Sequence, residues 1–161
     1  MKKIIALLVL VISIFSSTCF AASFSYTEDL QLGAFKVGDT YNEAKAISSY
    51  GKIVKNKKLK DKHFGPTQQI TFEKALVALR KSRVVGVETS KPYIATPKGI
   101  KVGDTTRDII NAYGDQAQTA SDGTGNTMAV FGGQGAELIF TINSKNQVVS
   151  IEVYGFEDNK K

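Results

Sequence analysis

The chain has 161 residues, with 21 Lys and Arg against 15 Asp and Glu, and its formal net charge is +6. This length suits one compact domain or two small ones. A single cysteine and a single histidine exclude an internal disulfide framework and the common zinc sites. The basic excess is mild, so it favours solubility and some affinity for anionic surfaces without indicating a nucleic-acid partner.

Residues 1–21 have the three-part layout of a secretory signal peptide. A basic start is followed by an apolar run from Ile4 to Phe15 and by small residues that end at Ala21. The apolar run is too short for a stable membrane anchor. We therefore expect export to the periplasm or the extracellular space, with possible envelope association. The mature chain would carry no transmembrane segment, and its net charge would fall from +6 to +4 with the loss of Lys2 and Lys3.

Cys19 leaves a second processing route open, because a lipoprotein would place its lipidated cysteine here. The preceding residues, Ser16-Ser17-Thr18, include no large apolar side chain, which favours cleavage after Ala21. The mature chain would then contain no cysteine. An exported chain without a disulfide depends on its hydrophobic core for stability.

A five-residue phrase, Lys-Val-Gly-Asp-Thr, occurs twice, beginning at Lys36 and at Lys101. Each copy is followed at a similar distance by Tyr-Gly, at residues 50–51 and 113–114. Internal repeats are sought first, because a missed repeat mis-assigns the whole fold. The phrase therefore divides the chain into two similar halves.

Each copy predicts the start of a short helix. Thr40 with Glu43, and Thr105 with Asp108, have the spacing of capping boxes. Glycine after the tyrosine predicts the end of each helix. The expected apolar faces are Ala44, Ile47 and Tyr50 in the first helix, and Ile109, Ile110 and Tyr113 in the second. The motif residues expected to be structural are Gly38, Asp39, Thr40, Gly51, Gly103, Asp104, Thr105 and Gly114.

After each predicted helix the pattern changes to short strands of an antiparallel meander. The expected strands are residues 52–54, 69–72, 76–79 and 84–89, then 116–119, 127–131, 138–142 and 148–153. In the last of them, one face would carry Val149, Ile151 and Val153, and the other Ser150, Glu152 and Tyr154.

The predicted fold class is α+β, with two tandem repeats that each pack a short helix on a three- to four-stranded antiparallel meander. One helix covers only one face of a sheet, so the other face must meet solvent or a partner. The predicted organisation is a signal peptide (1–21), an N-terminal arm (22–31), repeat 1 (32–89), a linker (90–99), repeat 2 (100–155) and a C-terminal tail (156–161).

The Gly-Asp-Thr helix start, the Tyr-Gly ending and the meander together resemble a unit shared by two protein groups. One is the β-lactamase inhibitory protein, a tandem repeat of such units, and the other is the SmpA/OmlA (BamE-type) envelope lipoproteins, which carry one unit. The chain also resembles secreted bacterial proteins with the phrase at residues 95–104 between repeats. The resemblance covers residues 32–154 and implies a secreted or envelope protein-binding module without catalysis.

The chain departs from both groups. The inhibitory protein is cross-linked by disulfides, whereas the mature chain here would have no cysteine. The BamE-type proteins carry a clear lipid-attachment cysteine, whereas Cys19 lacks the usual context. The similarity stops at the scaffold, so it assigns no binding residue.

A lysine-rich stretch is the strongest charge feature of the chain. It predicts a solvated hairpin loop, or a contact with an anionic envelope polymer, lipid head groups or an acidic partner. The second half has no counterpart, which favours a role particular to this protein. The lysines are Lys52, Lys55, Lys57, Lys58, Lys60 and Lys62.

The remaining polar residues predict no catalytic, cofactor or metal site. His63 lies in the lysine-rich stretch without a second zinc ligand. The Gly-rich turn at residues 121–126 lacks the lysine of a phosphate loop and the carboxylates of a calcium loop. Glu88 and Glu152 occupy equivalent strand positions, where they would face solvent or pair across the repeats.

The expected function is a secreted, non-enzymatic protein-binding or envelope-associated module that uses no cofactor. The open sheet faces, with Tyr93 and Tyr154 near their ends, are the expected protein contacts, because aromatic residues are enriched at interfaces. The expected partner is a protein or an anionic envelope component. An inhibitor of a secreted hydrolase is the alternative. A cell-wall-acting enzyme ranks third, and would need a metal or a deep pocket lined by Glu88, Glu152 and His63.

Overall fold

The computed structural model describes residues 23–60, 65–133 and 135–155. Within these ranges the chain forms two short helices, a two-stranded hairpin and an eight-stranded antiparallel sheet, an α+β fold. The helices are α2 (Glu43–Tyr50) and α3 (Thr106–Tyr113), and the hairpin is β1 (Gln31–Leu32) with β2 (Phe35–Lys36). The sheet comprises β3 (Ile53–Lys58), β4 (Gln68–Phe72), β5 (Leu76–Arg80), β6 (Arg83–Thr89), β7 (Gln118–Ser121), β8 (Thr127–Gly133), β9 (Ala136–Ile142) and β10 (Val148–Gly155).

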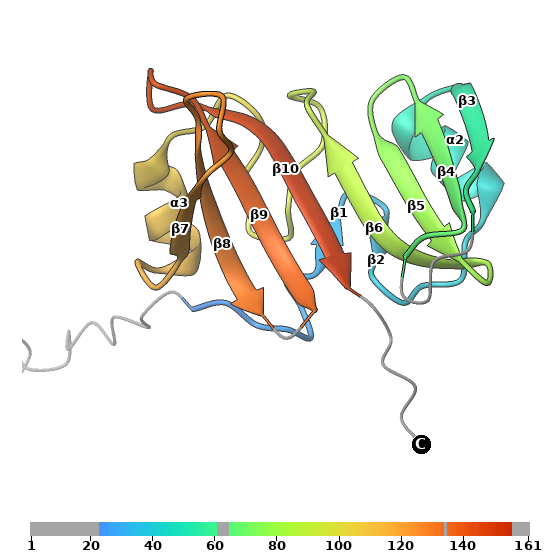
Figure 1. Ribbon diagram of the computed structural model, residues 1–161, viewed down its shortest axis with the longest axis horizontal. Helices are drawn as coiled ribbons and strands as arrows, with labels where there is room; N and C mark the ends of the chain where they lie inside the picture. Colours follow the sequence, from blue (N-terminus) through green and yellow to red (C-terminus); the bar gives the residue numbers. More distant parts are fainter. Residues whose placement is uncertain (1–22, 61–64, 134, 156–161) are drawn as a thin grey trace, which may run out of the picture.

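The order of strands in the sheet is β3-β4-β5-β6-β10-β9-β8-β7. Each half of the chain supplies four consecutive strands that pair as a meander, and the halves join where β6 and β10 pair antiparallel. In this register Glu88 lies opposite Glu152, and Val87 opposite Val153. Two meanders that the sequence predicts separately therefore form one continuous sheet (Figure 1).

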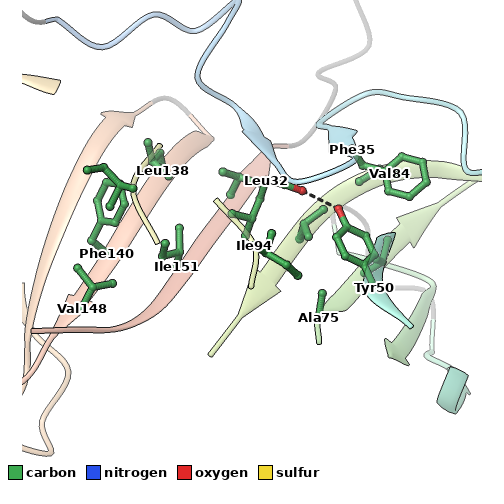
Figure 2. Close-up of a cluster of buried hydrophobic side chains, with 14 of the residues drawn as sticks. Leu32, Phe35, Tyr50, Ala75, Val84, Ile94, Leu138, Phe140, Val148 and Ile151 are labelled. Carbon is green, nitrogen blue, oxygen red and sulfur yellow. Dashed lines mark hydrogen bonds between the residues drawn. The ribbon is translucent and has the colours of Figure 1, made fainter. Parts of the chain in front are cut away.

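Both described helices and the β1–β2 hairpin pack on the same face of this sheet, and no helix of residues 23–60, 65–133 or 135–155 lies over the other face (Figure 1). One buried cluster includes Tyr50 of α2 and Tyr113 of α3. Figure 2 shows Leu32 and Ile94 between the apolar side chains of the two halves. Leu32 is fully buried and Ile94 is 4% exposed, so residues outside the sheet join the two cores into one.

The segments predicted as arm and linker pack against this body. Phe24 lies 6.2 Å from Phe131 of β8, measured between ring centroids. The carboxylate of Asp29 is buried, and its Oδ2 lies 3.1 Å from Nζ of Lys98. The chain thus passes along the second half before it enters the β1–β2 hairpin, where it meets the first half.

The helix starts differ between the two halves. At α3 the predicted capping box is present: the amide of Thr105 donates to Oδ2 of Asp108 at 2.8 Å, and Thr105 Oγ1 accepts from the Asp108 amide. The box predicted for Thr40 and Glu43 is wrong. Asn42 caps α2 instead, and its Oδ1 accepts from the Lys45 amide at 2.9 Å. The first copy is two residues longer between Thr and Tyr-Gly, which places Asn42 before the first turn.

The predicted helix faces are also partly wrong. Each helix buries two residues four positions apart, Ala46 with Tyr50 and Ile109 with Tyr113. Ala44 is exposed, and so are Ile47 and Ile110, the last two at 41% and 44%. Each helix is only eight residues long, and only two of its side chains are buried against the sheet. Which apolar residues are buried therefore depends on how the helix packs on the sheet. No helix in the described part of the chain is long and apolar enough to cross a membrane.

Two strand predictions need correction. The stretch predicted as a lysine-rich loop is largely β3, an edge strand of the sheet. In β10 the register shifts between Val148 and Ser150, so Val148, and not Val149, joins Ile151 in the core. An irregularity of this kind inverts the inside-outside alternation that the sequence pattern assumes.

The cap assignment gives a direct prediction. Asn42→Ala and Thr105→Ala should each lower the free energy of unfolding by about 1 kcal/mol, because each leaves a helix amide without its acceptor. Thr40→Ala should change it by less than about 0.5 kcal/mol, because Thr40 is exposed and caps no helix. Urea unfolding of the three variants measures this. Equal losses for Thr40→Ala and Asn42→Ala would show that Thr40 is the cap.

Candidate functional site

The repeated phrase forms a turn that is bonded to the last strand of each half. In the first half the amide of Gly38 donates to the carbonyl of Val84 at 2.8 Å. In the second half the amide of Gly103 donates to the carbonyl of Val148 at 2.9 Å. Within each turn the aspartate closes the loop: Oδ2 of Asp39 accepts from the Lys36 amide at 3.0 Å, and Oδ2 of Asp104 accepts from the Lys101 amide at 2.9 Å.

The two glycines after the tyrosines end the helices. Gly51 and Gly114 have φ of 85° and 84°, and their amides donate to the carbonyls of Ile47 and Ile110. Such a positive φ favours glycine. The repeated motif residues are therefore occupied in building turns and helix ends, away from the open sheet face.

The lysine-rich stretch does not form a single loop, because part of it is strand β3. Lys55 lies opposite Thr71 and Lys57 opposite Gln69, so both side chains stand on the open face at the β3 edge. Lys58 lies opposite Gln68, on the helix side. Lys52 precedes the strand and Lys60 follows it, both exposed, while Lys62 and His63 lie outside the described residues. Lysines on an edge strand hinder pairing with another sheet.

The two predicted contact tyrosines do not lie together. Tyr154 stands opposite Gly86 in the middle of β6, and its hydroxyl donates to Oε2 of Glu137 at 2.7 Å. Tyr93 follows the far end of β6, is 74% exposed, and has Nζ of Lys74 at 5.8 Å from its ring centroid. They therefore do not form one aromatic patch, and only Tyr154 belongs to the open face.

Side chains on the open face form rows that cross the strands. No described helix covers them, and they mix apolar, polar and charged groups. The register defines one row as Lys55, Thr71, Leu76, Glu88, Glu152, Ile139, Val130 and Gln118. The next row is Lys57, Gln69, Ala78, Gly86, Tyr154, Glu137 and Gly132.

A hollow of about 390 Å³ lies on this face beside the β6–β10 junction. Glu88 and Glu152 line it together, although the sequence pattern alone left their pairing open. The other lining residues are Pro66, Gln69, Leu76, Ala78, Val85, Gly86, Val87 and Tyr154. No motif marks Gly86 or Leu76 in the sequence, and the strand register alone brings them to the acidic pair.

Electrostatics distinguish this hollow from the rest of the face. Burial raises the pKa of Glu152, and the nearby carboxylates of Glu88 and Glu137 raise it further. Burial also raises the pKa of Tyr154 to about 12, together with its hydrogen bond to Glu137. In the described ranges, no group of three or more His, Cys, Asp or Glu side chains is arranged to hold a metal ion.

The raised pKa of Glu152 predicts how stability depends on pH. The neutral carboxyl is favoured in the folded state, so its stabilising contribution is full below the unfolded pKa and is lost as pH rises through the folded pKa. Glu152→Gln should therefore raise the free energy of unfolding at pH 7, by up to about 1 kcal/mol for relief of a cross-strand like-charge pair. The gain should vanish near pH 4. Urea unfolding at both pH values measures it, and a loss of stability at pH 7 would contradict it.

Comparison with known proteins adds a likeness of fold. No protein-family description matches the chain, and no curated protein matches it. An extracellular protein containing an SCP domain from Bacillus anthracis str. Ames has a similar structure, with a TM-score of 0.52 and 7% sequence identity. The match covers 74% of this chain and 44% of that one, less than half of its length.

A DUF4309 family protein (YjgB) from Bacillus subtilis subsp. subtilis str. 168 also matches. Its TM-score is 0.44 at 12% identity, over 74% of this chain and 81% of that one. At these identities the likeness to the SCP-domain protein concerns the fold alone.

Proposed function

We propose that the chain is a tandem repeat of one helix-plus-meander unit, of the kind found in the β-lactamase inhibitory protein and BamE-type group. Three features support this. Each half has the order helix and four strands. The turn of the repeated phrase makes the same bond to the last strand in each half. The register at the junction places the equivalent residues Glu88 and Glu152 opposite each other, as a local two-fold axis requires.

We further propose that the protein is a secreted, non-enzymatic module that binds another protein through its open sheet face. The observation that carries the proposal is the eight-stranded sheet with both described helices on one face, so that no described helix covers the apolar and polar side chains of the other face. A broad surface that mixes apolar and polar side chains suits a protein contact. Export is supported by the signal-peptide pattern of residues 1–21 and fits the similar fold of an extracellular protein.

A protein partner fits this face better than an anionic polymer does. Among the described lysines of the run, Lys55 and Lys57 stand on the face, whereas the centre of the face is acidic at Glu88 and Glu152. An anionic polymer would be repelled from that centre. Binding by the lysines alone would weaken steeply with salt, and a mixed surface should retain most of its affinity.

Site-specific photocrosslinking in the producing cell tests the proposal. A photoreactive residue replaces Ile139 or Val130 on the open face, and Ser48 or Asn111 on the exposed helix side serves as the control. We expect one discrete protein adduct from the open-face positions and none from the control positions. Adducts only from the helix side, or none from the open face, would refute the proposal.

Inhibition of a secreted hydrolase would be one form of the same contact. It predicts a stoichiometric complex and loss of the target's activity. A cell-wall-acting enzyme would need a deep pocket lined by Glu88, Glu152 and His63. The hollow has the first two of these residues in its lining. Turnover of cell-wall polymer that Glu152→Gln abolishes would replace the binding proposal with the enzymatic one.

A further inference from the structure

We propose that the hollow at the β6–β10 junction receives an arginine side chain of the partner protein. The inference rests on the proposed function, because it names the group by which a protein docked on the open face would be anchored. It is carried by the shape of the hollow, by its two unpaired carboxylates, and by the separation of charge across the face.

The shape of the hollow suits a long side chain with a polar head. Its walls include the half-buried side chains of Leu76, Ala78 and Tyr154. Gly86 has no side chain, so the floor beside Tyr154 stays open, where the second half has Ser150 at the corresponding place. Arginine packs its methylene stem on apolar walls and carries its charge at the end. The volume of about 390 Å³ lies in the range of small-ligand pockets.

The carboxylates of the hollow have no cationic partner among the residues that the structure describes. Glu88 and Glu152 stand directly opposite each other, and neither forms an ion pair with any described residue. Glu137 stands in the neighbouring row and accepts the Tyr154 hydroxyl. Two opposed carboxylates repel each other, whereas a planar guanidinium donates to both at once. An incoming arginine therefore removes the repulsion and supplies the missing donors.

A second charged region favours a protein surface over a free cation. Lys55 and Lys57 stand on the same face at the β3 edge, three strand positions from β6. Neighbouring strands lie about 4.8 Å apart, so the β3 edge is about 14 Å from β6, the strand that carries Glu88. A partner that presents arginine to the hollow and acidic side chains at that distance satisfies both regions. A small cation satisfies only one.

The test uses N-acetyl-arginine amide as the probe and N-acetyl-citrulline amide, its neutral isostere, as the matched control. Amide resonances of the labelled mature protein are followed by NMR during titration. We expect saturable shifts with the arginine probe at Gly86, Glu88 and Glu152, and none with citrulline. The pKa of Glu152 should fall when the probe binds, because a cation beside a carboxylate favours its ionised form.

Variants locate the binding. The double variant Glu88→Gln/Glu152→Gln should bind the arginine probe at least about tenfold more weakly, since the charge-assisted hydrogen bonds are lost. Glu28→Gln, a neutralised carboxylate in the N-terminal segment, should bind like the wild type. Thermal unfolding verifies that both variants fold, and removal of the repelling charges should not destabilise the sheet.

Several results would overturn the inference. They are equal shifts with citrulline, undiminished binding to the double variant, or no saturable shift with arginine. Equal occupation of the hollow by spermidine or Mg²⁺ would assign it to a free cation instead. If photocrosslinking from the open face succeeds while the arginine probe fails, only this inference falls. If crosslinking fails and the probe binds, the hollow recognises arginine, and the proposed function must be revised.

Discussion

Leu32→Ala should lower the free energy of unfolding by about 3–5 kcal/mol, a large share of the 5–15 kcal/mol typical of a domain. Leu32 is fully buried and lies between the apolar side chains of the two halves (Figure 2). Truncation removes its buried surface and leaves a cavity that the fixed sheet cannot fill. Because the cavity borders both halves, we expect one cooperative transition at a lower urea concentration, with both halves losing structure together.

The matched control for this experiment is Val54→Ala. Val54 is 67% exposed on the edge strand β3, so its truncation should change the free energy of unfolding by less than about 0.5 kcal/mol. Urea unfolding followed by circular dichroism measures both variants. Two separated transitions in Leu32→Ala would show instead that the halves are independent bodies, in which case the buried cluster does not couple them.

Tyr50→Phe should cost about 1–3 kcal/mol, although it removes a single oxygen atom. The Tyr50 hydroxyl is buried, donates to the Leu32 carbonyl at 2.6 Å and accepts from the Ala34 amide at 3.1 Å. Phenylalanine leaves the backbone carbonyl and the amide without this partner, and the cost comes from these unpaired groups. The bond holds the β1–β2 hairpin against α2, so amide hydrogen exchange at Ala34 should also accelerate.

The dependence of stability on pH gives a second test of the Tyr50 hydroxyl. Burial raises its pKa to about 12, so the hydroxyl remains a donor over the ordinary pH range. The stabilising contribution is complete below pH 10 and is lost as pH rises toward 12. Tyr93→Phe is the control, because Tyr93 is 74% exposed and should change stability by less than about 0.5 kcal/mol. Equal effects of the two substitutions would contradict the role of the Tyr50 hydroxyl.

The order of helices and strands could be predicted from the sequence, because it depends on local signals. The cap at Thr105 and the glycines that end both helices carry such signals. The helix start at Asn42 was missed because the first copy of the phrase is two residues longer, and a local rule offers two acceptable caps there. The core position of Val148 was missed because an irregularity in a strand leaves no mark in a pattern of alternating residues.

The candidate site was only partly predictable, because it depends on pairing between distant strands. Glu88 and Glu152 were identified as equivalent positions, but their meeting follows from the β6–β10 register. The lysines were found by composition, whereas β3 divides them between the two sides of the sheet. Tyr154 was predicted as a contact residue and lines the hollow, while Tyr93 lies beyond the C-terminal end of β6.

The β6–β10 junction also sets the order in which the chain is expected to fold. Pairs within each meander join neighbouring strands, whereas Glu88 and Glu152 are 64 residues apart in the sequence. Local hairpins form quickly, while distant strands pair only after the entropy of a long loop is lost. The two central strands of the finished sheet are therefore expected to pair last. Until they do, each half exposes a strand edge through which two newly synthesised chains can associate.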